Sequence, residues 1–422
     1  MNALVVGFVL SAALSASPEE NWPQWRGPTN DSVVHGKPLP VAFGPDKNVV
    51  WKATFPGWGN STPVIWDDAI FLTTQDNDAL IALRLNRKNG DVVWKKELGK
   101  GTPKRSGPVG NLRFHDETNM AAASPITDGK LVWWHFGNGD LTCTDFDGKT
   151  VWQENLLKNY GPYSIWWGHS NSPVLLGDLL VNVCMQDPKG GGKSYVVALD
   201  KNTGKERWFT DRTTGAKEEP ADSYTTPLLH TENGKTQIIV YGGNVLDAYD
   251  PVDGKRLWSA KPFNGNRVIS GPTLSKGVVY AVQGMKGPLF AVKAGGEGDV
   301  TKSNTLWNYK GSTPDASTPA VVGDLVFLAT NQGTVVCVDA KDGKEIWKER
   351  LGETFRATPL VSGNKLYLFS KEGVGTVLEA SREFKTLHRA EFGEQIIASP
   401  AAAQGDLYVR TKGHLYRFGA GK

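Results

Sequence analysis

The stretch DAKDGKEIW, residues 339–347, combines a turn signal with an aromatic residue at a fixed distance from it. Its Asp-Gly pair is typical of a tight turn between two strands, and a tryptophan follows the glycine by four residues. Four further copies keep this spacing, and a shortened one lacks the glycine; they end at Trp94, Trp152, Trp208, Trp258 and Trp307. Each copy therefore predicts a short strand that starts after a turn.

A second marker alternates with the first. It is a small or hydroxyl residue followed by proline and an apolar run, and it occurs at Pro63, Pro125, Pro173, Pro227, Pro272, Pro319, Pro359 and Pro400. Proline suits the entry of a strand, where no N–H is needed for the ladder. Units of this length with four short strands each indicate a β-propeller.

The predicted outer strand of each unit contains one position that recurs in all eight units. These positions hold seven tryptophans and one histidine: Trp51, Trp94, Trp152, Trp208, Trp258, Trp307, Trp347 and His388. We expect the tryptophans to be structural residues that pack between neighbouring blades, each with a partner for its indole N–H. The sequence leaves the role of His388 open.

The two ends of the chain predict how the ring closes. Only three strands follow Pro400, whereas residues 48–53 supply one outer strand without inner strands before it. Pairing the two removes a free edge. The predicted fold is therefore all-β, an eight-bladed propeller of four-stranded blades over residues 47–422, preceded by a strap (18–46) and a signal peptide (1–17).

Composition and the N-terminus limit the class of protein. Residues 1–17 form an apolar run that ends in small residues, which predicts an export signal; it is too short for a membrane span. Lys plus Arg number 47 against 44 Asp plus Glu, so no nucleic-acid partner is expected. We expect a periplasmic or secreted monomer, without a disulfide framework because only three distant cysteines occur.

The segment WPQWRGP, residues 22–28, precedes the first strand. One interpretation is a peptide that docks a partner. The other, which we favour, is a strap whose two indoles cover the propeller while Arg26 hydrogen-bonds a loop, because an unanchored terminus would not need two tryptophans.

The connections between blades differ in length on one face. From outer tryptophan to repeat proline there are 31 residues after Trp94, 21 after Trp152 and 19 after Trp208, against a minimum of 12. The same face carries the loops between second and third strands, and we call it the loop-rich face. Long connections on a rigid scaffold usually hold the binding site.

The loop-rich face supplies the candidate site residues. Candidates for ligand binding are Trp58, Asn60, Arg113, Trp167, His169, Asn171, Glu219, Asp222, Arg267, Arg356 and Glu394. His115, Asp116 and Glu117 are candidates for catalysis, but adjacent residues on an extended loop seldom share one ion, so no metal site is expected. Such residues suit a polar or anionic small molecule, or a peptide; the alternative is ordinary loop packing and surface ion pairs.

The two alternating markers resemble those of the quinoprotein-dehydrogenase-like eight-bladed propeller family, over roughly residues 47–422. The N-terminal NWPQWRGPTND also resembles the opening of secreted bacterial proteins with PQQ-like repeats. The resemblance implies the fold. It does not choose an activity, because the family includes PQQ-dependent dehydrogenases as well as the non-enzymatic lipoprotein of the outer-membrane β-barrel assembly machinery.

Three functions follow from this resemblance and these residues. The first is a non-catalytic binding or scaffold module without a cofactor, whose partner is an unknown protein, peptide or polar small molecule. The alternative is a PQQ- and calcium-dependent alcohol or sugar dehydrogenase, which needs a carboxylate base and oxygen ligands for calcium. The chain lacks the adjacent cysteines of many such enzymes and a C-x-x-C-H haem motif. A weaker third function is hydrolysis or carbohydrate binding by Trp58, Trp167 and His169.

Overall fold

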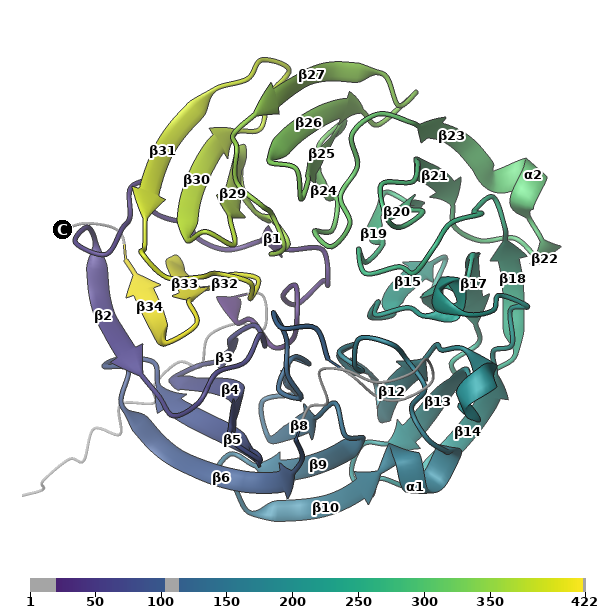
Figure 1. Cartoon of the computed structure of the whole chain (residues 1–422), viewed down its shortest axis with the longest axis horizontal. Coiled ribbons are helices and arrows are strands. Elements are labelled where there is room, and N and C mark those ends of the chain that lie inside the picture. The colour runs from purple at the N-terminus through teal and green to yellow at the C-terminus, as the bar shows by residue number, and fades with distance from the viewer. Residues whose placement is uncertain (1–19, 103–113, 420–422) are drawn as a thin grey trace, which may run out of the picture.

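In the computed structural model, which describes residues 20–102 and 114–419, a strand begins directly after every repeat proline. In seven units four strands pair antiparallel in sequence order from the inner strand to the outer strand, and the eighth unit takes its outer strand from residues 49–54. The units form a ring (Figure 1), and residues from every unit line a tunnel at its centre. The predicted eight-bladed β-propeller is confirmed.

Blades 1 to 4 follow the chain through its first half. Blade 1 consists of β3 (Val64–Trp66), β4 (Ala69–Asp76), β5 (Ala79–Asn86) and β6 (Val92–Lys100), and blade 2 of β7 (Ile126–Thr127), β8 (Leu131–His135), β9 (Asp140–Asp145) and β10 (Thr150–Asn155). Blade 3 consists of β11 (Val174–Leu176), β12 (Leu179–Cys184), β13 (Tyr195–Asp200) and β14 (Glu206–Asp211), and blade 4 of β15 (Leu228–Glu232), β16 (Lys235–Gly242), β17 (Val245–Tyr249) and β18 (Arg256–Ala260). Short helical turns α1 (Leu156–Tyr160), η2 (Pro188–Gly190) and η3 (Glu219–Ala221) lie in their connections.

Blades 5 to 8 complete the ring. Blade 5 consists of β19 (Thr273–Ser275), β20 (Val278–Val282), β21 (Leu289–Lys293) and β23 (Thr305–Tyr309), and blade 6 of β24 (Ala320–Val322), β25 (Leu325–Ala329), β26 (Thr334–Asp339) and β27 (Glu345–Arg350). Blade 7 consists of β28 (Leu360–Ser362), β29 (Lys365–Phe369), β30 (Val374–Glu379) and β31 (Thr386–Glu391). Blade 8 consists of β32 (Ala401–Ala403), β33 (Asp406–Arg410), β34 (His414–Phe418) and the N-terminal β2 (Val49–Thr54). Two extra strands, β1 (Val33–Val34) and β22 (Gly298–Asp299), pair in parallel with β28 and β18.

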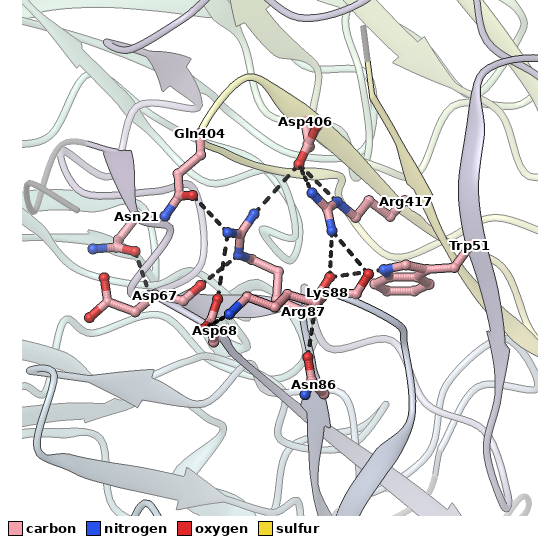
Figure 2. A network of polar contacts seen from close by, with 10 residues as sticks. All are labelled: Asn21, Trp51, Asp67, Asp68, Asn86, Arg87, Lys88, Gln404, Asp406 and Arg417. Carbon is pink, nitrogen blue, oxygen red and sulfur yellow. Dashed lines mark hydrogen bonds and ion pairs between the residues drawn. The ribbon is translucent and has the colours of Figure 1, made fainter. Parts of the chain in front are cut away.

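The ring closes between the two ends of the chain, as predicted. β2 pairs antiparallel with β34, and Trp51 lies opposite Arg417. Figure 2 shows the polar network at the junction of blades 8 and 1. Arg417 pairs with Asp406 at 2.7 Å and donates to the backbone oxygen of Arg87 at 2.7 Å; the Arg87 guanidinium donates to Gln404 at 2.7 Å. These contacts add to the β2–β34 ladder within blade 8 and to the chain segment that runs from β2 to β3 of blade 1.

The outer tryptophans connect each blade to the next. Trp208 in blade 3 donates its indole N–H to the backbone oxygen of Pro251 in the blade 4 turn, at 2.9 Å. Its ring covers Gly254 of the same turn, where an added Cβ would lie 2.4 Å from the indole and φ is +72°. The glycine therefore gives the backbone its positive φ and also leaves room for the neighbouring tryptophan.

The same contact recurs around the ring. Indole N–H groups donate to a backbone oxygen in the next blade's turn at the pairs Trp51–Arg87, Trp94–Phe146, Trp152–Lys201, Trp307–Ala340 and Trp347–Ser381. Trp94, Trp307 and Trp347 are partly exposed, whereas the other four outer tryptophans are buried.

Two junctions depart from this contact. Trp258 instead donates to the side chain of Gln237 in its own blade, at 2.6 Å. The next blade replaces its tight turn by an insertion with β22 and α2 (Thr301–Asn304). His388 lies in blade 7, next to blade 8, which has no turn between its third and fourth strands because its fourth strand is the N-terminal β2. Its Nε2 lies 2.5 Å from the backbone oxygen of Phe43, so the strap provides the missing partner.

The strap lies on the face opposite the loop-rich face. Trp22 forms two backbone hydrogen bonds with Ile65 in blade 1, at 2.9 and 2.8 Å. The buried Arg26 donates to the backbone oxygen of Pro272 at 2.8 Å and to Thr273 at 2.7 Å, in blade 5. β1 then joins blade 7, and the purple N-terminal segment in Figure 1 crosses the centre of the ring. The strap thus spans the tunnel.

Some predictions concern parts of the chain that the structure does not describe. The signal peptide, residues 1–17, lies outside the described residues. Among the residues that are described, no helix is long and apolar enough to cross a membrane. Cys143, Cys184 and Cys337 are buried and unpaired.

Replacing Trp208 by alanine tests the contact between blades. Because the side chain is 7% exposed and loses both its packing and its hydrogen bond, we expect the free energy of unfolding to fall by about 3–5 kcal/mol. Urea denaturation followed by fluorescence or circular dichroism measures it. Val252→Ala, in the same turn but 85% exposed, is the control; equal effects of the two variants would contradict the account.

Candidate functional site

The residues before the repeat prolines form a belt of hydroxyl groups around the tunnel. The backbone N–H of Thr62 donates to the Ser124 hydroxyl at 2.9 Å, that of Ser124 to Ser172 at 3.0 Å, and that of Ser172 to Thr226 at 3.0 Å. Thr358 donates in the same way to Ser399 at 3.1 Å. A hydroxyl that accepts from the backbone keeps its own hydrogen to donate. The belt therefore links blades and can present O–H donors to the tunnel.

At one position of the belt the residue is Gly271 instead of a hydroxyl residue, and Trp25 of the strap packs against it. An added Cβ at Gly271 would lie 3.2 Å from the ring of Trp25. Trp25 lines the tunnel, and the guanidinium of the neighbouring Arg26 lies 5.4 Å from its ring centroid. Trp25 therefore forms the floor of the tunnel on the side of the strap.

Above this floor the tunnel holds a cavity of about 350 Å³, within the usual size range of ligand pockets. Every blade contributes to its wall. The lining residues are Trp25, Asn60, His115, Glu117, Thr118, Ala122, Ser124, Trp167, Ser170, Ser172, Tyr224, Thr226, Arg267, Ile269, Ala316, Thr318, Arg356, Thr358, Ile397 and Ser399.

Charged side chains alternate in sign along one side of the cavity. Glu219 pairs with Arg267 at 3.1 Å, and Arg267 lies 3.6 Å from Asp315. Asp315 lies 3.7 Å from Arg356. These residues come from three different connections on the loop-rich face and from η3, so the ion pairs hold four successive blade connections together.

Glu117 extends this chain of charges across the mouth of the cavity. It lies in the long connection between blades 1 and 2, yet it pairs with Arg356 at 3.0 Å and with Lys371. Arg356 lies just before blade 7, and Lys371 lies in a loop of blade 7. Burial alone would raise the pKa of Glu117, but the hydrogen bond from Lys371 and the charge of Arg356 outweigh it and lower the pKa. Glu117 is therefore ionised at neutral pH.

The opposite wall comes from the loops of blades 1 to 3. The Trp167 indole N–H donates to Glu219 at 3.2 Å, and the His115 ring meets the Trp167 ring edge-on at 5.7 Å between centroids. The Asn60 side chain donates to the backbone oxygen of Glu117 at 2.7 Å. Aromatic and charged groups thus meet at one mouth.

The structure brings six of the candidate residues onto the cavity wall. They are Asn60, His115, Glu117, Trp167, Arg267 and Arg356. Glu219 lies behind the wall as the partner of Arg267 and Trp167. Arg113 lies outside the described residues.

Three candidates are buried in the protein and do not line the cavity. His169 stacks on Tyr163 with 4.3 Å between centroids, and burial lowers its pKa well below the ordinary value. Asn171 donates to the backbone oxygen of Val183 at 2.5 Å. Asp222 accepts the backbone N–H of Trp166 at 2.8 Å. These residues fix the loops that carry the wall.

Three other candidates lie away from the cavity, closer to solvent. Lys412 covers the ring of Trp58, with its amine 5.4 Å from the ring centroid. Asp116 is exposed. Glu394 pairs with His414 at 2.6 Å in blade 8. None of the three lines the cavity.

The site also contains residues that were not among the candidates. Trp25, Asp315, Lys371 and the belt hydroxyls complete the floor, the charge chain and the wall. The hydroxyl before each repeat proline is visible as a sequence pattern. The positions of Asp315 and Lys371 follow only from how the connections fold over the tunnel.

The residues of the cavity do not fit a quinone cofactor held by calcium. Calcium takes six to eight oxygen ligands, usually including carboxylates. Glu117, Glu219 and Asp315 are each already engaged by arginine or lysine, so bound calcium would sit among guanidinium groups. Within the described parts of the chain, no three His, Cys, Asp or Glu side chains converge on a metal position.

The repeats match the family model described as outer membrane protein assembly factor BamB over residues 31–191, 192–318 and 297–383. The chain belongs to this family. It is 24% identical to the BamB of Burkholderia pseudomallei, over 78% of this chain and 87% of the relative.

A dehydrogenase is also among the relatives, and another has a similar fold. A polyvinylalcohol dehydrogenase of a Pseudomonas species is 22% identical over 79% of this chain and 68% of that protein. The solved quinohemoprotein alcohol dehydrogenase of Comamonas testosteroni superposes with a TM-score of 0.72 at 12% identity, covering 96% of this chain and 82% of that one. The relatives therefore include BamB proteins and a dehydrogenase, the quinohemoprotein shares the fold, and similarity does not choose between a scaffold and an enzyme.

Asp222 makes the stability of the loop-rich face depend on pH. Burial, together with the charges of Asp187 and Glu219, raises the pKa of Asp222 to about 7 from 3.8. Between these values the folded protein binds a proton that the unfolded chain releases. The free energy of unfolding should therefore fall as pH rises from about 4 to about 7, by at most about 1.4 kcal/mol per pH unit.

Urea denaturation at a series of pH values measures this dependence in the wild type and in Asp222→Asn. We expect a weaker pH dependence in the variant, because asparagine does not titrate. Identical pH profiles of the two proteins would contradict the assignment.

Proposed function

We propose that this protein is an exported, non-catalytic binding module that holds a polar ligand, or a segment of a partner, in the cavity at the loop-rich face. The observation that carries the proposal is the cavity itself. It has a tryptophan floor, a wall of hydroxyl groups from the blades and a charged mouth. Such a combination of flat apolar surface and convergent polar groups is typical of binding sites.

The state of the carboxylates supports binding over oxidation. A general base must be able to take up a proton from the substrate. Glu117 is held ionised by Arg356 and Lys371, and its pKa lies below the ordinary value. Glu219 and Asp315 are likewise paired with arginines. The lowered pKa makes Glu117 a weak base, and the ion pairs of the other two carboxylates occupy their oxygens with arginine.

The family supports a role in the cell envelope. Several relatives are named outer membrane protein assembly factors, and we propose for this chain a comparable scaffold role. Residues 1–17 would direct export to the periplasm or beyond, and residues 18–46 would act as the strap of a propeller formed by residues 47–422. The polyvinylalcohol dehydrogenase relative supports the alternative, a PQQ-dependent oxidation at the same face.

Filling the cavity tests the proposal. Ala316 lines the cavity, and Ala316→Trp places a bulky side chain inside it. We expect the variant to lose the ligands or partners that the wild type captures from an envelope extract, as measured by mass spectrometry of both eluates. Val252→Trp adds the same side chain to an exposed turn on the opposite face and is the control.

Retention of every captured species by Ala316→Trp, with a thermal melt equal to that of the control, would place binding elsewhere on the molecule. Oxidation of an alcohol or sugar by the purified protein loaded with PQQ and calcium, followed by dye reduction, would favour the alternative.

A further inference from the structure

We propose that Glu117 is an internal carboxylate that occupies the anion subsite of this cavity, and that the ligand is a small carboxylate, such as a sugar acid, that displaces it. The inference rests on the proposed binding function and specifies its ligand. The subsite consists of Arg356 and Lys371, which hold Glu117 across the mouth.

Glu117 is suited to displacement because its side chain and its backbone are held separately. Asn60 donates to the backbone oxygen of Glu117 at 2.7 Å. The side chain alone reaches Arg356 and Lys371, from a connection that belongs to blades 1 and 2. A rotation of that side chain would free both cations while the backbone contact remained.

The charges at the mouth favour one incoming carboxylate. Arg267, Arg356 and Lys371 carry three positive charges, and with Glu117 displaced the carboxylates paired with them among the described residues are Glu219 and Asp315. One bound carboxylate restores the balance, and arginine presents two parallel donors to it. A neutral ligand would leave the mouth with an uncompensated cation in a partly buried site.

The rest of the cavity fits a hydroxylated ring. The Ser124, Ser172, Thr226 and Ser399 hydroxyls accept backbone N–H groups, so each has a hydrogen to donate to ligand oxygens. Trp25 offers an aromatic surface at the floor. A volume of about 350 Å³ is near the lower limit for ligand pockets, which favours a single ring over a long peptide.

The competing explanation is that Glu117 only tethers its connection to blade 7. The two explanations predict opposite effects of removing the charge. If Glu117 competes with the ligand, Glu117→Gln strengthens binding of a carboxylate. If it only tethers the connection, the variant binds equally or more weakly.

The experiment is a calorimetric titration of the full chain with D-glucuronate, and with D-glucose as the probe that lacks the carboxylate. In Glu117→Gln we expect glucuronate to bind at least about tenfold more tightly than in the wild type, because the ligand no longer competes with an ion pair. Arg356→Gln should abolish this gain in the double variant. Glu353→Gln removes a carboxylate from the Arg389 ion pair outside the cavity and should leave affinity unchanged.

A second probe pair separates the sources of the carboxylate. Acetyl-triglycine with a free C-terminus, compared with its amide, shows whether the group belongs to a peptide end. A gain in Glu117→Gln for the free peptide but not for glucuronate assigns the subsite to a peptide carboxylate and rejects the sugar acid.

No gain for either acid, or an equal gain in Glu353→Gln, overturns the inference. If Ala316→Trp still abolishes capture from extract in that case, the binding function stands and only its ligand class falls. Glu117→Asp, which keeps the charge on a shorter side chain, serves if Glu117→Gln does not fold; it should show a smaller gain in the same direction.

Discussion

The contact between an outer tryptophan and the turn of the next blade sets the spacing of the ring. The indole covers a glycine that has no side chain to displace it and donates to a backbone oxygen of the same turn, as Trp208 does with Gly254 and Pro251. The inner belt repeats the principle at the tunnel, where a hydroxyl such as Ser172 accepts the backbone N–H of the preceding blade. The two contacts occur together at the junctions between blades 1 and 4, and one of them occurs at most of the other junctions. The blades therefore form a rigid frame that can hold irregular connections over its tunnel.

The departures from the repeat mark the places where other parts of the chain are needed. His388 replaces a tryptophan at the junction where blade 8 has no turn between its third and fourth strands. Phe43 of the strap contacts His388 there. Gly271 replaces a hydroxyl residue where Trp25 enters the tunnel. The strap therefore contributes to ring closure and to the floor of the cavity. A tunnel that is closed on one side and surrounded by charged side chains on the other can enclose a ligand, which is the physical basis of the proposed binding function.

The fold could be predicted from sequence because it depends on local signals that recur: Asp-Gly turns, prolines at strand entry and a tryptophan four residues after each glycine. The face of the site could be predicted from loop lengths. Its composition could be predicted only in part. His169 and Asp222 look like surface groups in the sequence but are buried under the loops, since nothing local states how a long connection folds back. The pairing of Glu117 with Lys371 joins residues 254 positions apart, and no repeat signal encodes it.

The paired carboxylates distinguish a binding module from a quinone enzyme. Adding calcium tests whether these carboxylates are available as metal ligands. A calorimetric titration of the purified protein with PQQ, with and without calcium, measures this most directly. We expect no calcium-dependent binding, because arginine and lysine already neutralise Glu117, Glu219 and Asp315. Saturable one-to-one binding that requires calcium, lost in a variant without these carboxylates, would contradict this expectation and identify the loop-rich face as a dehydrogenase site.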